Sequence, residues 1–149
     1  MWNLAKIVLI VVASLSVVER AQGQPFVHFS ISREPLSLGM IAGPGKQKLE
    51  AHLTARVVAN CPYHVEAGFR ALVHESGQSG IPPANLRVVI NGTTIPVGGS
   101  LTPVASSRIP TPRAGVDVPI DVDVEVAGAM AYPAGRYCGT LTIKVMAGL

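Results

Sequence analysis

The sequence predicts an all-β protein, and we expect an antiparallel β-sandwich of about seven or eight strands. Beyond the first two dozen residues, apolar and polar residues alternate at period two in short runs, and no stretch has helical periodicity. The 149-residue chain also holds 15 glycines and 12 prolines, which punctuate these runs. Such alternation indicates strands with one buried face, and many short strands favour two packed sheets. A closed barrel is the alternative, because its strands alternate in the same way.

Residues 116–126 form the clearest predicted strand. One face carries Val116, Val118, Ile120, Val122, Val124 and Val126, and the other carries Asp117, Asp121, Asp123 and Glu125. Pro119 lacks a backbone N–H, which predicts an edge strand or a bulge at this point.

The next clearest signal is a hairpin. Residues 86–90 and 93–97 flank Asn91-Gly92, a dipeptide suited to a type I′ turn because both central residues need positive φ. Residues 136–145 repeat the alternation, with Tyr137, Leu141, Ile143 and Val145 on the inward face.

Four more strands are predicted in the first half of the chain. They cover residues 26–31, 36–41, 48–59 and 63–73. The inward series are Leu49, Ala51, Leu53, Ala55, Val57 and Ala59 in one, and Tyr63, Val65, Ala67, Phe69 and Val73 in another. The stretches 42–46, 75–85, 98–115 and 128–135 are rich in turn residues, and we expect one domain over residues 24–149.

The N-terminus predicts a secretion signal, residues 1–23. Lys6 precedes an apolar run from Ile7 to Val18, whose length fits the roughly 7–15 residues of a signal core and is short of the roughly 20 that span a bilayer. Ala21 and Gly23 have the small-residue spacing of a cleavage site, which places the cut after Gly23. We therefore expect a secreted protein of the periplasm or cell surface, without a stable membrane span after cleavage; an uncleaved anchor is the alternative.

The charge of the remaining chain argues against nucleic-acid binding. Removal of Lys6, Arg20 and Glu19 changes the count from 12 Lys+Arg and 9 Asp+Glu to 10 and 8. The remaining cations are scattered, whereas nucleic-acid binding requires a dense basic face. No nucleic-acid partner is expected.

Two cysteines, Cys61 and Cys138, remain in a chain expected in an oxidising compartment. An even pair there favours a disulfide, worth roughly 4–5 kcal/mol in the chain-entropy model for so long a loop. Strict alternation, however, points Cys138 outward with Thr140 and Thr142, so the pairing requires a bulge near Cys138-Gly139 or attachment at a sheet rim. Two free buried thiols are the alternative.

No constellation in the sequence predicts catalysis, a cofactor or a metal. The acidic row on residues 116–126 forms a line along one strand, which fits a solvated face better than a calcium site. The histidines His28, His52, His64 and His74 have no metal-ligand spacing. His74-Glu75-Ser76 is the one tight cluster of a base, an acid and a hydroxyl, and neighbours on a strand end do not readily form a triad. We expect no enzyme.

Three stretches together resemble the spore coat protein U and fimbrial (pilin-like) subunit families. They are Pro35-Leu36-Ser37-Leu38-Gly39-Met40, then Leu53 to Cys61 followed by Tyr63-His64-Val65, and Tyr132-Pro133-Ala134-Gly135-Arg136-Tyr137-Cys138 with the Thr-rich strand behind it. The chain departs from the families in one respect, since they usually pair a first-strand cysteine with the counterpart of Cys61 and none is present near residues 26–38.

This resemblance implies an immunoglobulin-like or pilin-like sandwich that assembles by strand donation. In such subunits, a neighbour's N-terminal extension completes the sheet through main-chain hydrogen bonds. The candidate donor is residues 24–32, with Phe26, Val27, Phe29 and Ile31. The alternative is that this segment is the domain's own first strand.

The function expected from these observations is that of a secreted, non-enzymatic structural subunit. Its partners would be identical or related subunits that pair through strand edges. The alternative is a secreted carbohydrate- or protein-binding sandwich that does not polymerise. Sugar binding usually uses exposed aromatic rings, and Tyr132 is the one aromatic residue that we expect in an exposed loop.

Overall fold

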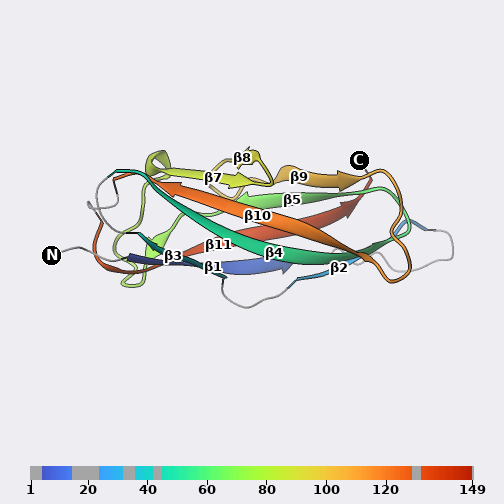
Figure 1. The fold of residues 1–149 in the computed structure, drawn as a ribbon, viewed down its shortest axis with the longest axis horizontal. Helices are drawn as coiled ribbons and strands as arrows, with labels where there is room; N and C mark the ends of the chain where they lie inside the picture. Colours follow the sequence, from blue (N-terminus) through green and yellow to red (C-terminus); the bar gives the residue numbers. More distant parts are fainter. Residues whose placement is uncertain (1–4, 15–23, 32–35, 42–44, 129–131, 149) are drawn as a thin grey trace.

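The computed structural model describes residues 5–14, 24–31, 36–41, 45–128 and 132–148. These residues form two β-sheets packed face to face (Figure 1), which confirms the predicted all-β sandwich. Strand pairs are antiparallel except one, in which β1 runs parallel to β11. Large aliphatic and aromatic side chains fill the space between the sheets, and no described polar side chain is fully buried with them.

The first sheet has the strand order β2-β4-β10-β7-β8. Its strands are β2 (Val27–Ile31), β4 (Gln47–Ala59), β10 (Val116–Val126), β7 (Leu86–Ile90) and β8 (Thr93–Ile95), and a 3-10 turn, η1 (Pro83–Asn85), precedes β7. β10 pairs with β4 along its whole length, so these two strands form the centre of the sheet.

The second sheet has the order β3-β1-β11-β5-β9, and β6 also pairs with β11. Its strands are β3 (Leu36–Ile41), β1 (Ala5–Ser14), β11 (Gly135–Ala147), β5 (Tyr63–Phe69), β9 (Thr102–Ser107) and β6 (Val73–His74). The predicted leader thus supplies a strand of this sheet.

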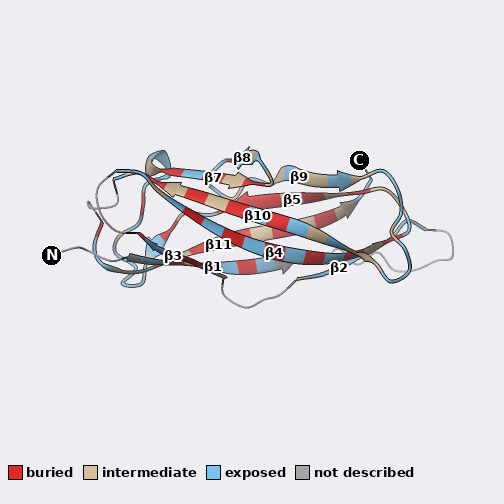
Figure 2. Cartoon of the chain, in the orientation of Figure 1, coloured by how far each residue is buried: buried red, intermediate tan, exposed pale blue. Residues whose placement is uncertain are grey.

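The predicted alternation is confirmed along the long strands (Figure 2), where every inward residue predicted in 48–59 and 136–145 is buried. Val73 is the exception, with 44% of its surface exposed. The chain leaves β5 after Phe69, and Leu72 takes the inward position with no exposed surface. The predicted strand 63–73 therefore divides into β5 and β6.

The predicted hairpin is confirmed as β7 and β8. Asn91 has φ 48° and Gly92 has φ 78°, the two positive values of a type I′ turn. Pro119, expected at an edge or a bulge, lies in the central strand β10, yet β7 pairs with β10 only from Val122 onward. The Asn91 side chain accepts a hydrogen bond from Asp121 N (2.8 Å) and donates one to Pro119 O (3.2 Å). The proline thus lies where the ladder toward β7 has ended.

β9 was not predicted, because residues 98–115 contain many turn residues. Its residues alternate poorly between buried and exposed positions. Among the described strands it pairs only with β5, with a register shift between Val65 and Glu66. An edge strand that lacks a fully buried face leaves no clear period-two signal.

The predicted disulfide is wrong in this structure, where Cys61 and Cys138 are both free thiols. Tyr63, two residues after Cys61, pairs with Ala147 at the far end of β11. Cys138 pairs with Val73 near the start of that strand. The intervening nine residues of β11 span roughly 30 Å at about 3.3 Å per residue, whereas a disulfide needs Cα atoms within about 7 Å.

Candidate functional site: a strand slot between β3 and β11

The feature with the clearest functional meaning is the position of β1. It lies inside its sheet, antiparallel to β3 on one side and parallel to β11 on the other (Figure 1). Ten consecutive residues of β1 pair with Gly135–Lys144 of β11 without a shift. We call the space that β1 fills between β3 and β11 the slot.

The slot takes large aliphatic side chains from β1. Ile7 and Leu9 have no exposed surface and Val11 has 4%. Burial of one such side chain contributes roughly 1.5–3 kcal/mol, so the three contribute roughly 5–9 kcal/mol, an upper value because an unfolded chain already buries part of its surface. A whole domain is stable by only about 5–15 kcal/mol, so the occupant of the slot matters greatly for stability.

Two glycines line the slot at the places where these side chains enter. Gly139 of β11 pairs with Leu9, and a Cβ atom at residue 139 would lie 3.1 Å from Leu9 Cδ2 and 2.8 Å from Leu72 Cδ2. On the other side, Gly39 of β3 pairs with Ile7 and has φ 108°. The lack of a side chain at residue 139 thus gives room to Leu9 of the occupying strand.

β3 belongs to its sheet through β1. Within the described part of the chain, β1 is the strand with which β3 forms a ladder. Neighbouring strands lie about 4.8 Å apart, so an empty slot would separate β3 from β11 by roughly 10 Å. Loss of residues 5–14 would leave two unpaired strand edges beside an open apolar groove.

Apart from the exposed Lys6 at its start, the described outward face of β1 is apolar as well. Ile10 is 48% exposed and Val12 is 44% exposed, and Met40 on the neighbouring β3 is 53% exposed. An outward row of aliphatic residues is unusual for a sheet face in water, where polar residues normally alternate with the buried ones. The all-round apolar character instead fits the core of a secretion signal.

The predicted donor segment lies elsewhere, in the opposite sheet. Val27, Phe29 and Ile31 belong to β2, which pairs antiparallel with Ala55–Ala59 of β4. Phe29 is buried against the core, Phe26 is half-buried, and the backbone N–H of Phe26 donates to Asn60 Oδ1 at 2.8 Å. The alternative in which this segment is the domain's own first strand is the arrangement seen here.

The acidic row of β10 is matched by cations on the neighbouring strands. Its ion pairs are Arg56–Asp117 at 2.8 Å, His52–Asp121 at 2.7 Å, Lys48–Asp123 at 3.4 Å and Arg87–Glu125 at 3.5 Å. The hydrogen bond with Asp121 raises the pKa of His52, and the hydrogen bond between Lys48 and Glu50 raises the pKa of Lys48 and lowers that of Glu50. Among the described residues, no group of His, Cys, Asp and Glu side chains could hold a metal ion.

The cluster of His74, Glu75 and Ser76 does not have the geometry of a catalytic triad. His74 Nδ1 lies 2.9 Å from Ser76 Oγ and also accepts from the Ser76 backbone N–H at 3.2 Å. The other ring nitrogen faces the Ala134 carbonyl oxygen at 3.1 Å, and Glu75 pairs with Arg136 instead of with the histidine. The acid therefore does not orient the base, as a triad requires.

Tyr132, expected in an exposed loop, is buried. Its hydroxyl contacts the Asn85 side chain and donates to the Ala127 carbonyl oxygen at 3.3 Å. Within the described part of the chain no phenylalanine or tyrosine is in the exposed class, so these residues do not form the exposed platform of Phe and Tyr rings that sugar binding usually uses.

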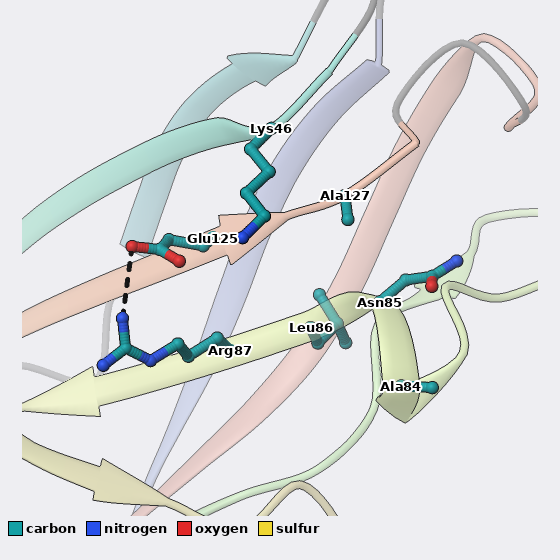
Figure 3. A pocket seen from close by; sticks show the side chains of 7 residues that line it. All are labelled: Lys46, Ala84, Asn85, Leu86, Arg87, Glu125 and Ala127. Carbon is teal, nitrogen blue, oxygen red and sulfur yellow. Dashed lines mark ion pairs between the residues drawn. The ribbon is translucent and has the colours of Figure 1, made fainter.

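A shallow hollow lies beside this tyrosine, at one end of β7 and β10 (Figure 3). Its lining residues are Lys46, Ala84, Asn85, Leu86, Arg87, Glu125 and Ala127. Arg87 and Glu125 form an ion pair in it, and the Arg87 side chain is 59% exposed. Charges so open to water are strongly screened and hold a ligand weakly.

Across the described residues, no helix is long and apolar enough to cross a membrane. The cluster of His74, Glu75 and Ser76 lacks the geometry of a reactive site, and the hollow lacks that of a ligand-holding site. This leaves the slot as the candidate functional site. Compared with known proteins, the chain matches no family model and no curated sequence.

Proposed function

We propose that this chain is an exported, non-enzymatic structural subunit that assembles with identical or related subunits through strand pairing. One observation carries the proposal: residues 5–14, which include most of the apolar run predicted as the leader's core, are also an inner strand of a sheet. Cleavage after Gly23 would remove that strand, so the exported domain would carry an empty slot.

An empty slot favours assembly for two physical reasons. The edges of β3 and β11 would present unpaired N–H and C=O groups, which readily accept another strand. The groove that holds Ile7, Leu9 and Val11 would expose apolar surface, and a partner strand would cover it. A fimbria-like or coat-like surface subunit would use such a site, in line with the family resemblance.

The identity of the donor is a separate question. Donation by residues 24–32 of a neighbour stays a prediction, and it would require β2 to separate from β4 in the donating subunit. A strand from a related subunit would need no such rearrangement.

Sedimentation of purified residues 24–149 over a range of concentrations tests the proposal. We expect species larger than a monomer that grow with concentration. A folded monomer at high concentration would contradict the proposed assembly. A parallel measurement on residues 33–149 tests the donor, because assembly that persists without residues 24–32 would eliminate that segment.

A further inference from the structure

We propose that residues 5–14 are a built-in occupant of the slot, so that the chain which retains them is closed to partner strands. This inference rests on the proposed function, because it takes the slot to be the assembly surface. It adds a means of control: loss of the leader is the event that makes the subunit able to assemble.

The fit of the occupant supports this inference. β1 pairs with β11 over its full length, and the inward side chains of Ile7, Leu9 and Val11 are buried to 96% or more. Gly139 leaves room for Leu9 on the β11 side, and Gly39 pairs with Ile7 on the β3 side. A strand in this register pairs with both edges of the slot at once and leaves no free ladder inside the slot for a partner.

Attachment in the same chain strengthens the occupancy. A strand joined by a short linker binds with an effective concentration on the order of millimolar. A partner strand at micromolar concentration would then compete poorly, whatever its own affinity for the slot. Cleavage of the linker removes this advantage and lets the occupant leave.

Cys138 provides a natural reporter of occupancy. It lies on the outward row of β11, paired with Val8 on one side and with Val73 on the other. Departure of β1 uncovers one of these sides. Cys61 lies after β4, where its thiol contacts the Phe26 carbonyl oxygen at 3.7 Å, and it serves as the internal control.

The experiment uses the full chain, expressed without export and carrying an engineered protease site after Gly23. Alkylation rates of the two thiols and the sedimentation of the chain are measured before and after cleavage. Before cleavage, we expect a monomer in which Cys138 reacts slowly. After cleavage and dilution, we expect Cys138 to react several-fold faster with the Cys61 rate unchanged, and the chain to assemble.

Added peptides test whether the slot selects its occupant. A lysine-tagged peptide of residues 5–14 should restore the slow Cys138 reaction and the monomer, whereas the same peptide with Leu9→Asp should not. In the uncleaved chain, Leu9→Asp should accelerate Cys138 alkylation, and the matched outward change Ile10→Asp should not. If the cleaved chain unfolds, the comparison of Leu9→Asp with Ile10→Asp in the uncleaved chain still tests whether β1 occupies the slot.

The outcomes separate this inference from the proposed function. If the uncleaved wild-type chain assembles and its Cys138 reacts as fast as after cleavage, residues 5–14 are not an occupant and the inference is overturned. If Cys138 becomes reactive after cleavage but the chain stays monomeric, the occupant is real and the proposed assembly through the slot is wrong.

Discussion

β1 and β10 are both inner strands, and they differ in the faces that they turn to water. β10 buries Ile120, Val122, Val124 and Val126 and exposes acidic residues that pair with cations on β4 and β7. β1 buries Ile7, Leu9 and Val11 just as completely, but its outward face has exposed Ile10 and Val12. Both strands thus bury aliphatic residues on the inward face. On the outward face, β10 carries charged residues whereas β1 carries aliphatic ones.

It follows that burial alone does not distinguish a permanent strand from a replaceable one. The outward residues of β10 suit that one position, because each carboxylate meets a cation on an adjacent strand. The exposed Ile10 and Val12 of β1 are aliphatic and form no ion pairs, so they suit an apolar leader as well as a strand. The predictions below contrast the two strands.

The largest expected difference is between Val122→Asp and Leu9→Asp in the full chain. Both place a charge at a site with no exposed surface, which costs several kcal/mol. Val122→Asp should abolish folding, because β10 cannot leave its place between β4 and β7. Leu9→Asp should release β1 and leave a folded but less stable body, as followed by circular dichroism during heating. Equal loss of structure in both variants would show that β1 is as essential as β10.

Gly139→Ala should have the next largest effect. Its Cβ would crowd Leu9 and Leu72, and overpacking of this kind costs about 1–3 kcal/mol. Urea unfolding should show this loss in the full chain. A partial rescue by Leu9→Ala would appear as a smaller loss when Gly139→Ala is introduced into Leu9→Ala, each compared with its own parent. The outward change Thr140→Ala, on the next residue of the same strand, is the control, expected to change stability by less than about 0.5 kcal/mol. No rescue by Leu9→Ala would mean that Leu72 alone causes the crowding.

A smaller effect is expected on the outward face of β10. His52 is protonated more readily than usual because of Asp121, which raises its pKa. A raised folded-state pKa gives stability that is present below the unfolded pKa of histidine and is lost as the pH rises through the folded value. An NMR titration should show the raised pKa of His52, and Asp121→Asn should bring it down. An unchanged His52 titration in Asp121→Asn would contradict the assigned cause.

The smallest effect is expected from the cysteines. Tyr63, two residues after Cys61, pairs with Ala147, which lies roughly 30 Å along β11 from Cys138. An intramolecular bond between the two cysteines would therefore require the fold to open. Intact mass without reductant should show two free thiols, and replacement of both by serine should leave the melting temperature almost unchanged. A mass lower by two hydrogens would show that the bridge forms after all.

Local pattern by itself determined most of the strands. Residues 48–59, 116–126 and 136–145 alternate strictly, and alternation is a property of each strand alone. The Asn91-Gly92 turn was equally local, because positive φ is a demand on two residues. The acidic row of residues 116–126, the two cysteines and the apolar run near the N-terminus were also visible in the sequence. The residues that each of them contacts were not.

Tertiary structure alone decided which strands meet and which side chains become neighbours. The pairing of residues 5–14 with β11, the burial of Tyr132 and the separation of Cys61 from Cys138 all depend on strand order and register. The apolar run was predicted as a leader, and its length and composition also fit a strand, so nothing within the run chooses between them. The slot between β3 and β11 exists only once distant segments have paired, because contacts between strands far apart in the chain are not encoded by the period of either strand.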